Sequence, residues 1–138
     1  MSEKLIINDN SFPKRIIALS LNESSFRASW IIGKNLGLEF KKEPNIELKQ
    51  KGQKLSLDNY TCIQQNDLIF RLIANKSELN YLVQKHKNFD YFLMFSNTST
   101  GPKLSEVRAK LQEAKGILGA FIMNPPKEVS KVLKNYTF

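Results

Sequence analysis

The chain has 138 residues, of which 41% are hydrophobic and 25% charged, values that fit one globular domain and exclude wholesale disorder. No apolar run approaches the roughly 20 residues of a membrane-spanning helix, so a membrane-embedded protein is excluded too. Cys62 is the only cysteine, which excludes an internal disulfide and a cysteine-rich zinc site. The first residues do not form a secretion signal, so we expect a cytoplasmic protein.

The charge balance is strongly basic, with 21 Lys and Arg against 13 Asp and Glu, a net charge of +8. Such a balance is compatible with nucleic acid as a partner. The lysines are spread along the whole chain, however, and arginine, the usual residue for bidentate recognition of phosphate and guanine, occurs only four times. This distribution favours a solvated surface over a nucleic-acid footprint.

Residues 1–12 are expected to be a loosely ordered lead-in to a single domain that spans residues 1–138. The segment Lys14–Leu21 is apolar on both faces, which predicts an interior strand. A helix is predicted over Glu23–Leu36, with Asn22 as its N-cap and Gly37 as a left-handed C-terminal residue.

Two further features of this helix stand out. Phe26 and Trp30, four residues apart, form a second stripe beside the main apolar face. Gly33 lies in the helix interior, where glycine costs about 1 kcal/mol relative to alanine. A close approach of the helix to the sheet would offset that cost.

A β-rich stretch follows, with a predicted strand at Leu38–Lys42 and an interruption at Pro44. The alternating pattern then turns near Gly52 and reaches a hairpin whose turn is Gln64–Asp67. The next connection is expected to be irregular, with three apolar anchors: Leu79, Leu82 and Val83.

The segment Phe89–Phe95 is apolar on both faces except at Asp90, which predicts a central strand. Its second face needs a cover, and a dimer interface is one candidate. A helix is predicted over Lys103–Lys115, with Pro102 at its first position. The strand Ile117–Met123 follows, parallel to Phe89–Phe95 through a right-handed crossover. A short C-terminal helix would carry three apolar residues: Val129, Val132 and Leu133.

These elements predict a two-layer α+β domain with a mixed β-sheet and two amphipathic helices on one face. Two strand–helix–strand units separated by a hairpin favour a ferredoxin-like or ACT-like organisation.

One turn is a candidate anion or ligand site because it precedes a helix N-terminus, which can bind anions through free backbone N–H groups. The glycine patterns of phosphate-binding loops are absent, and the hydroxyl groups can cap the helix themselves. We therefore expect a capping turn rather than a catalytic loop. The candidate residues are Ser96, Thr98, Ser99, Thr100, Gly101 and Lys103.

No catalytic, metal-binding or cofactor-binding residue is predicted. His86 is the only histidine and has no sequence partner for catalysis or metal binding, and Cys62 fits a small buried residue. Asp90 needs a partner if it is buried, for which Arg71 or a nearby lysine is the candidate. The aromatic residues around it lack the consensus of RNA-binding sheets and are explained by core packing.

The chain resembles the IPExxxDY proteins, a family of uncharacterised small bacterial proteins. The resemblance lies in "SWIIGKNLGLEFKK", "FDYFLMF" and the terminal "LKNYTF", with Asp90 and Tyr91 as the Asp-Tyr pair; the Ile-Pro-Glu part is absent. It covers most of the chain in layout and implies no activity.

The leading functional hypothesis is a non-catalytic binding or self-associating module, with homodimerisation through an open sheet face or an edge strand. A nucleic-acid-binding protein is the alternative. A small-ligand sensor or enzyme is the second alternative, with its ligand at the Ser96–Gly101 turn.

Overall fold

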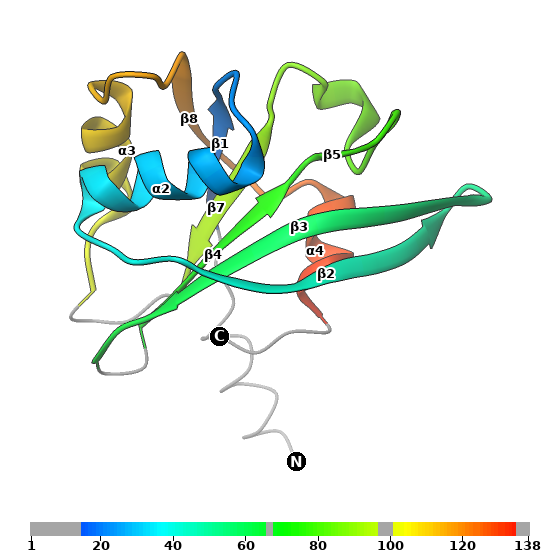
Figure 1. Ribbon diagram of the computed structural model, residues 1–138, viewed down its shortest axis with the longest axis horizontal. Coiled ribbons are helices and arrows are strands. Elements are labelled where there is room, and N and C mark those ends of the chain that lie inside the picture. The colour runs from blue at the N-terminus through cyan, green and yellow to red at the C-terminus, as the bar shows by residue number, and fades with distance from the viewer. Residues whose placement is uncertain (1–14, 66–67, 97–100, 135–138) are drawn as a thin grey trace.

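The computed structural model describes residues 15–65, 68–96 and 101–134. Six strands form one sheet in the order β2-β3-β4-β7-β1-β8 (Figure 1). Their bounds are Ile16–Ser20 (β1), Lys41–Gln50 (β2), Gln53–Ile63 (β3), Ile69–Ala74 (β4), Tyr91–Phe95 (β7) and Gly119–Met123 (β8). The helices are α2 (Ser25–Leu36), α3 (Leu104–Gln112) and α4 (Lys127–Leu133). Two-residue strands, β5 (Lys76–Ser77) and β6 (Asn80–Tyr81), and a 3₁₀ turn, η2 (Gln84–His86), connect β4 to β7.

Every pair of neighbouring strands in the described part of the chain is antiparallel, so the prediction of a mixed sheet is wrong. Strands β7 and β8 do run in the same direction, as the crossover through α3 requires. They are not neighbours, because β1 lies between them, with Leu19 paired to both Tyr91 and Ala120. The crossover therefore skips one position in the sheet.

Helices α2 and α3 cover one face of the sheet, as predicted (Figure 1). Leu93 in the central strand β7 is fully buried there, in one apolar cluster with Ile32 of α2 and Leu111 of α3. The amphipathic pattern of both helices is thus explained by their contact with the sheet.

The opposite face of the sheet has its own apolar cluster, so the domain is not limited to two layers. Helix α4 packs there through Val129, Val132 and Leu133, as its sequence predicts. Leu82 and Val83 join it, and Phe92 of β7 is fully buried among them. The prediction that Leu79 is a third anchor is wrong, because that side chain is 90% exposed. The second face of β7 is therefore covered within one chain.

The ends of α2 are only partly as predicted. The helix begins two residues later than expected, with Ser24 rather than Asn22 at the N-cap, where the backbone N–H of Ala28 donates to the Ser24 carbonyl. Both residue types are favourable N-caps, so the sequence alone does not separate them. At the other end Gly37 has φ +70°, the left-handed conformation that was predicted.

Gly33 lies where the chain leaving α2 folds back against the helix. A Cβ atom at this position would come within 2.4 Å of the Leu38 carbonyl oxygen and 3.4 Å of the Phe40 ring. The close approach that would offset the cost of a helical glycine is therefore made to the segment after the helix.

The other predicted boundaries differ in detail. Residues 38–40 are not a strand, and β2 instead begins at Lys41 and continues past Pro44 with a shift of register between Glu43 and Ile46. Helix α3 is shorter than expected at both ends, and its first residue is Leu104, so Pro102 does not occupy the first helical position. Strands β3 and β4 form the predicted hairpin, with Ile63 paired to Ile69, and residues 66 and 67 of its predicted turn lie outside the described residues.

Among the residues described, no helix has both the length and the apolar character needed to cross a membrane.

Candidate functional site

The predicted ligand turn is partly visible. Ser96 is buried and extends the pairing of β4 and β7: its Oγ accepts a hydrogen bond from the Ile69 N–H at 3.0 Å, and its own N–H donates to the Ile69 carbonyl. Thr98, Ser99 and Thr100 lie outside the described residues. Gly101 is half-buried and Lys103 is exposed. Ser96 therefore has a structural role at the end of the β4–β7 pairing. That the turn caps α3 and binds no ligand stays a prediction.

The start of α3 is capped from within the helix. The carboxylate of Glu106 accepts a hydrogen bond from the backbone N–H of Lys103 at 3.2 Å, and the Glu106 N–H donates to the Lys103 carbonyl at 3.0 Å. A carboxylate at a helix N-terminus is favourable because the helix dipole is positive there. The same charge would repel an anion.

A hollow of about 450 Å³ lies beside this helix start, between the end of α2 and α3. Its lining is mainly apolar, with Glu106 and Lys110 as the charged members: Leu36, Phe70, Pro102, Glu106, Val107, Ala109 and Lys110.

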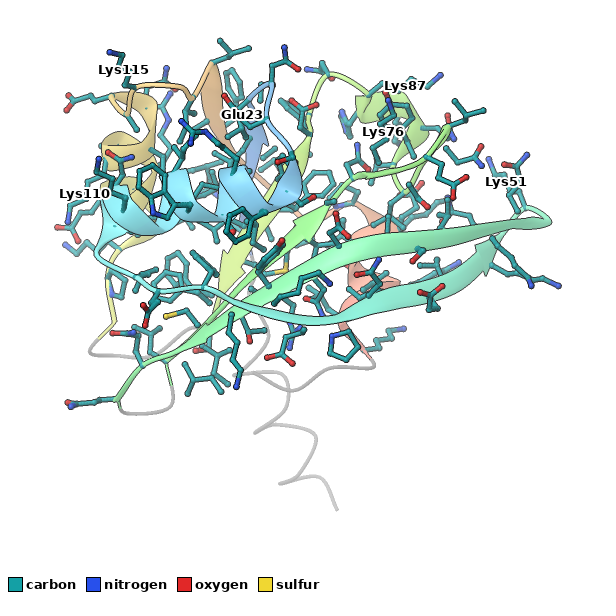
Figure 2. The ribbon with its side chains drawn as sticks, in the orientation of Figure 1. Glu23, Lys51, Lys76, Lys87, Lys110 and Lys115 are labelled. Atoms are coloured by element: carbon teal, nitrogen blue, oxygen red, sulfur yellow. The ribbon has the colours of Figure 1, made fainter. Side chains whose placement is uncertain are left out.

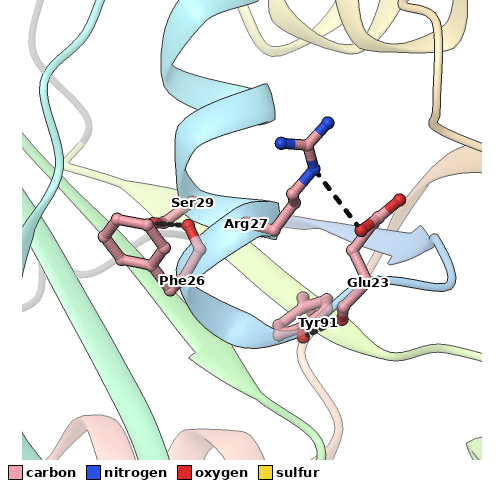
Figure 3. A network of polar contacts seen from close by, with 5 residues as sticks. All are labelled: Glu23, Phe26, Arg27, Ser29 and Tyr91. Atoms are coloured by element: carbon pink, nitrogen blue, oxygen red, sulfur yellow. Dashed lines mark hydrogen bonds and ion pairs between the residues drawn. The ribbon is translucent and has the colours of Figure 1, made fainter.

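Asp90 and Tyr91 both hold the connection between β1 and α2. The Asp90 carboxylate accepts a hydrogen bond from the Leu21 N–H, and the Tyr91 hydroxyl donates to the Glu23 carbonyl at 2.7 Å (Figure 3). Burial raises the pKa of the Asp90 carboxyl above its ordinary value, and the Leu21 N–H and the charge of Lys76 oppose that rise. Burial likewise raises the pKa of the Tyr91 hydroxyl. These hydrogen bonds give the Asp-Tyr pair a structural role.

His86 and Cys62 each have structural contacts. The His86 ring lies 5.6 Å from that of Phe89, and its carbonyl accepts a hydrogen bond from the side chain of Asn75. Cys62 is buried in β3, and Gln64 donates a hydrogen bond to its Sγ. Within residues 15–65, 68–96 and 101–134, no three His, Cys, Asp or Glu residues are grouped so that they could hold a metal ion.

Sequence reasoning missed Asn75, which is fully buried and connects the end of β4 to the segment before β7. Its side-chain amide donates to the carbonyls of His86 and Phe89 and accepts from the Val83 N–H. In the sequence Asn75 is a single asparagine directly after an apolar strand, and such a residue indicates only that the strand ends.

A buried polar cluster on β2, β3 and β4 was also missed. The Arg71 guanidinium donates to Asn59 Oδ1 at 3.0 Å, and the Thr61 hydroxyl donates to the Glu43 carboxylate at 2.7 Å. These four residues line a hollow of about 280 Å³. Polar residues at alternate positions of otherwise apolar strands were the signal for this cluster.

The outward side of α2 carries a second aromatic stripe, as predicted, and it is open to solvent. Phe26 is 76% exposed and Trp30 is 52% exposed. The guanidinium carbon of Arg27 lies 5.6 Å from the centre of the Trp30 ring, and Lys34 Nζ lies 5.0 Å from it. We call Phe26, Arg27, Trp30 and Lys34 the α2 outer face.

Glu23 forms an ion pair with Arg27 at 3.7 Å at one end of this face (Figure 3). Both side chains are well exposed, so the pair contributes little to stability. Residues Ser25–Leu36 of α2 include two basic and no acidic side chains, and the face is therefore positively charged.

No protein-family model matches the chain, and comparisons with curated proteins and with solved structures found no match.

Several of the basic residues lie far apart on the surface of the molecule. Figure 2 shows Lys110 and Lys115 beside α3, Lys76 and Lys87 near β5, and Lys51 at the tip of the β2–β3 hairpin. Lys76 and Lys87 both lie within 6 Å of the Tyr81 ring centre, at 5.9 and 5.8 Å. These five lysines do not form one continuous basic strip.

Proposed function

We propose that the protein is a non-catalytic cytoplasmic binding module that recognises another macromolecule through the α2 outer face. The observation that carries the proposal is the exposure of Phe26 and Trp30 on one side of α2. Large aromatic side chains are usually buried, and a cluster of exposed ones is typical of an interaction site. Tryptophan and arginine are also the residues most enriched at the energetic centres of protein interfaces.

Self-association is less well supported than binding to a different partner. The sheet face opposite α2 and α3 is covered by α4, Leu82 and Val83. At the edge strand β8, Ala120 already bonds side chains of α3: its carbonyl accepts from Arg108 Nε, and its N–H donates to Gln112 Oε1. These contacts blunt that edge against another strand.

We propose a ferredoxin-like core as part of the same interpretation. With β2, β3 and the two-residue strands β5 and β6 set aside, the order from β1 to β8 is strand, helix, strand, strand, helix, strand, and these four strands lie in the sheet in the order β4-β7-β1-β8. Helices on one face of such an antiparallel sheet are typical of ferredoxin-like domains. The ACT-like variant would place a small ligand between helix and sheet, and the hollow between α2 and α3 is the candidate location.

Membership of the IPExxxDY family is likewise a proposal. The Asp-Tyr pair of this chain fixes the β1–α2 connection through Leu21 and Glu23. If related chains have the same β1–α2 connection, this structural role would explain why they contain the Asp-Tyr pair. If aligned family members kept the Asp-Tyr pair but lacked a β1–α2 unit before it, the proposal would be wrong.

Site-specific photo-crosslinking tests the proposed binding module. A photoreactive phenylalanine analogue replaces Phe26, and a control protein carries it at Lys54, an exposed position on β3. We expect a larger adduct from position 26 and none from position 54 in the cells that express the protein. The adduct should weaken when Trp30 is also changed to alanine. Equal adducts from both positions, or none from position 26, would contradict the proposal.

The same experiment separates the partner classes. An adduct destroyed by protease treatment of the partner indicates a protein, and one destroyed by nuclease indicates a nucleic acid. An adduct of twice the chain mass in the purified protein would indicate self-association instead.

Nucleic acid is the second candidate because of the net charge of +8, which attracts a phosphate backbone. A gel-shift titration with unrelated oligonucleotides at two salt concentrations tests it directly. Binding through phosphates must weaken steeply as salt rises.

A further inference from the structure

We infer that the partner of the α2 outer face is an acidic segment of another protein that places an apolar side chain against Phe26 and Trp30. This inference rests on the proposed function and adds the chemistry of the partner to it. It depends on the arrangement of the rings and charges along α2.

The two rings form one apolar contact area. Residues four apart on a helix are neighbours on its surface, so Phe26 and Trp30 lie side by side along one stripe. Aromatic side chains bury about 150–250 Å² each when they are covered. Two rings that are 76% and 52% exposed therefore offer enough apolar area for a complementary side chain of a partner.

Two positive charges lie beside the Trp30 ring, and one negative charge, that of Glu23, lies at the end of the face. Arg27 and Lys34 are three residues before and four residues after Trp30, and both lie within 6 Å of its ring centre. Glu23 pairs with Arg27 only, at one end of the face. A partner that covers the rings is expected to bring a carboxylate near Lys34 and to compete with Glu23 for Arg27, because a cation that loses its hydration without a counter-charge is costly.

A second copy of this chain fits the face poorly. A two-fold interface would bring the cations of one α2 against those of the other, and each chain carries a net charge of +8. Like charges placed opposite each other in an interface cost several kcal/mol.

A single-stranded nucleic acid also fits poorly, because bases bind by stacking on open ring faces. Two cations already lie over the Trp30 ring, which leaves less of it open for stacking. In Figure 2, Lys51, Lys76 and Lys87 lie on the opposite side of the view from Lys110 and Lys115, so these five lysines do not line one path for a phosphate backbone.

A displayed library of random peptides is the direct test. The full chain serves as bait, and the Phe26→Ala/Trp30→Ala double variant removes peptides that bind elsewhere. Trp30 is the only tryptophan of the chain, so tryptophan-free peptides can be followed by the emission of one known residue. Oligo-dT and vesicles that contain phosphatidylserine are tested beside the peptides.

Two matched charge variants identify the contribution of the cations. Arg27→Gln/Lys34→Gln removes two charges from the α2 outer face, and Lys51→Gln/Lys54→Gln removes two from the β2–β3 hairpin, where both lysines are exposed and Figure 2 shows Lys51 at the tip. We expect selected peptides to combine Asp or Glu with large apolar residues. The first variant should bind them at least about tenfold more weakly and the second within about twofold, because screened surface charges away from the contact have little effect.

The outcomes separate this inference from the proposed function. Peptides that need Phe26 and Trp30 but show no excess of acidic residues would overturn the inference and leave the binding module standing. Oligo-dT or vesicles that bind the α2 outer face while peptides do not would also overturn it. If no probe binds the wild type better than the Phe26→Ala/Trp30→Ala variant, both proposals fail. Circular dichroism of each variant confirms that it is folded before its binding is compared.

Discussion

The carboxylate of Asp90 accepts a hydrogen bond from the backbone N–H of Leu21 at 3.0 Å, which ties the residue before β7 to the residue after β1. The Asp90 backbone extends the same contact, because its N–H donates to the Leu19 carbonyl at 2.8 Å. Its carbonyl accepts from the N–H of Asn75, the residue after β4. Three neighbouring strands are therefore joined at their ends around one partly buried acid.

Changing Asp90 to asparagine should make stability less dependent on pH. Burial raises the pKa of this carboxyl in the folded protein above its ordinary value of 3.8. Its stabilising contribution is therefore complete below pH 3.8 and is lost as the pH rises through the raised pKa. Asparagine can still accept from the Leu21 N–H but does not ionise. We expect Asp90→Asn to gain stability relative to the wild type as the pH rises from below 3.8 to neutrality.

Urea unfolding of both proteins across this pH range gives the comparison, since all other acids contribute equally to each. Lys76→Gln is a second informative variant. The charge of Lys76 lowers the Asp90 pKa, so removing that charge should raise this pKa further. A difference between wild type and Asp90→Asn that did not change with pH would show that burial does not control this acid.

Changing Tyr91 to phenylalanine should cost about 1 kcal/mol, the net contribution of a typical hydrogen bond. The ring would stay buried, but the Glu23 carbonyl would lose the hydroxyl that donates to it at 2.7 Å. Chemical denaturation measures the change. Tyr81→Phe is the control, because the Tyr81 ring is only half-buried, and its effect should stay within about 0.5 kcal/mol. Equal effects of the two substitutions would mean that the contact with Glu23 contributes nothing.

The sequence predicted the individual helices and strands better than it predicted which strands are adjacent in the sheet. Apolar periodicity located the two main helices, the central strand and the stripe of α4 that carries Val129, because each pattern reflects burial of one side of an element. It could not show that β1 separates β7 from β8, since strand order depends on contacts between residues far apart in the chain. The wrong prediction of a mixed sheet arose because β7 and β8, which run in the same direction, were assumed to be adjacent.

The same limit applies to the candidate site. Spacing placed Phe26 and Trp30 on one stripe of a helix, but only the packed structure shows that nothing in the described part of the chain buries this stripe. Asn75 could not be recognised as a buried connection, because its three side-chain partners lie among the following 14 residues, which contain only very short elements. Side-chain chemistry identified candidates, and tertiary contacts decided which of them are exposed.

Replacing Gly33 with alanine should destabilise the protein, although alanine favours helices over glycine by about 1 kcal/mol. The added Cβ would lie 2.4 Å from the Leu38 carbonyl oxygen, a backbone atom that moves only if the end of α2 moves with it. Overpacking of this kind typically costs about 1–3 kcal/mol. Subtracting the helical gain leaves an expected net loss of up to about 2 kcal/mol in the free energy of unfolding.

Lys34→Ala in the same helix is the matched control, because Lys34 is exposed and its loss should change stability by less than about 0.5 kcal/mol. A Gly33→Ala protein as stable as the wild type would show that the segment after α2 can move away at little cost.

The two neighbouring residues Phe92 and Leu93 should be about equally intolerant of truncation, because they project from β7 into opposite layers. Leu93 packs with Ile32 and Leu111 under α2 and α3, and Phe92 packs with the α4 cluster; both are fully buried. We expect Leu93→Ala to cost about 2–5 kcal/mol and Phe92→Ala about 3–5 kcal/mol, as in other buried sites. Leu93→Asp should unfold the domain.

Thermal and urea unfolding of the two alanine variants provides the measurement. Phe121→Ala is the control on the edge strand β8, where the ring is 47% exposed and should contribute much less. A Phe92→Ala protein that lost less than about 1 kcal/mol, beside a Leu93→Ala protein that lost several, would mean that the α4 side of the sheet is loosely packed. That face would then be open to a partner, and the preference for the α2 outer face over a sheet-face dimer would have to be reversed.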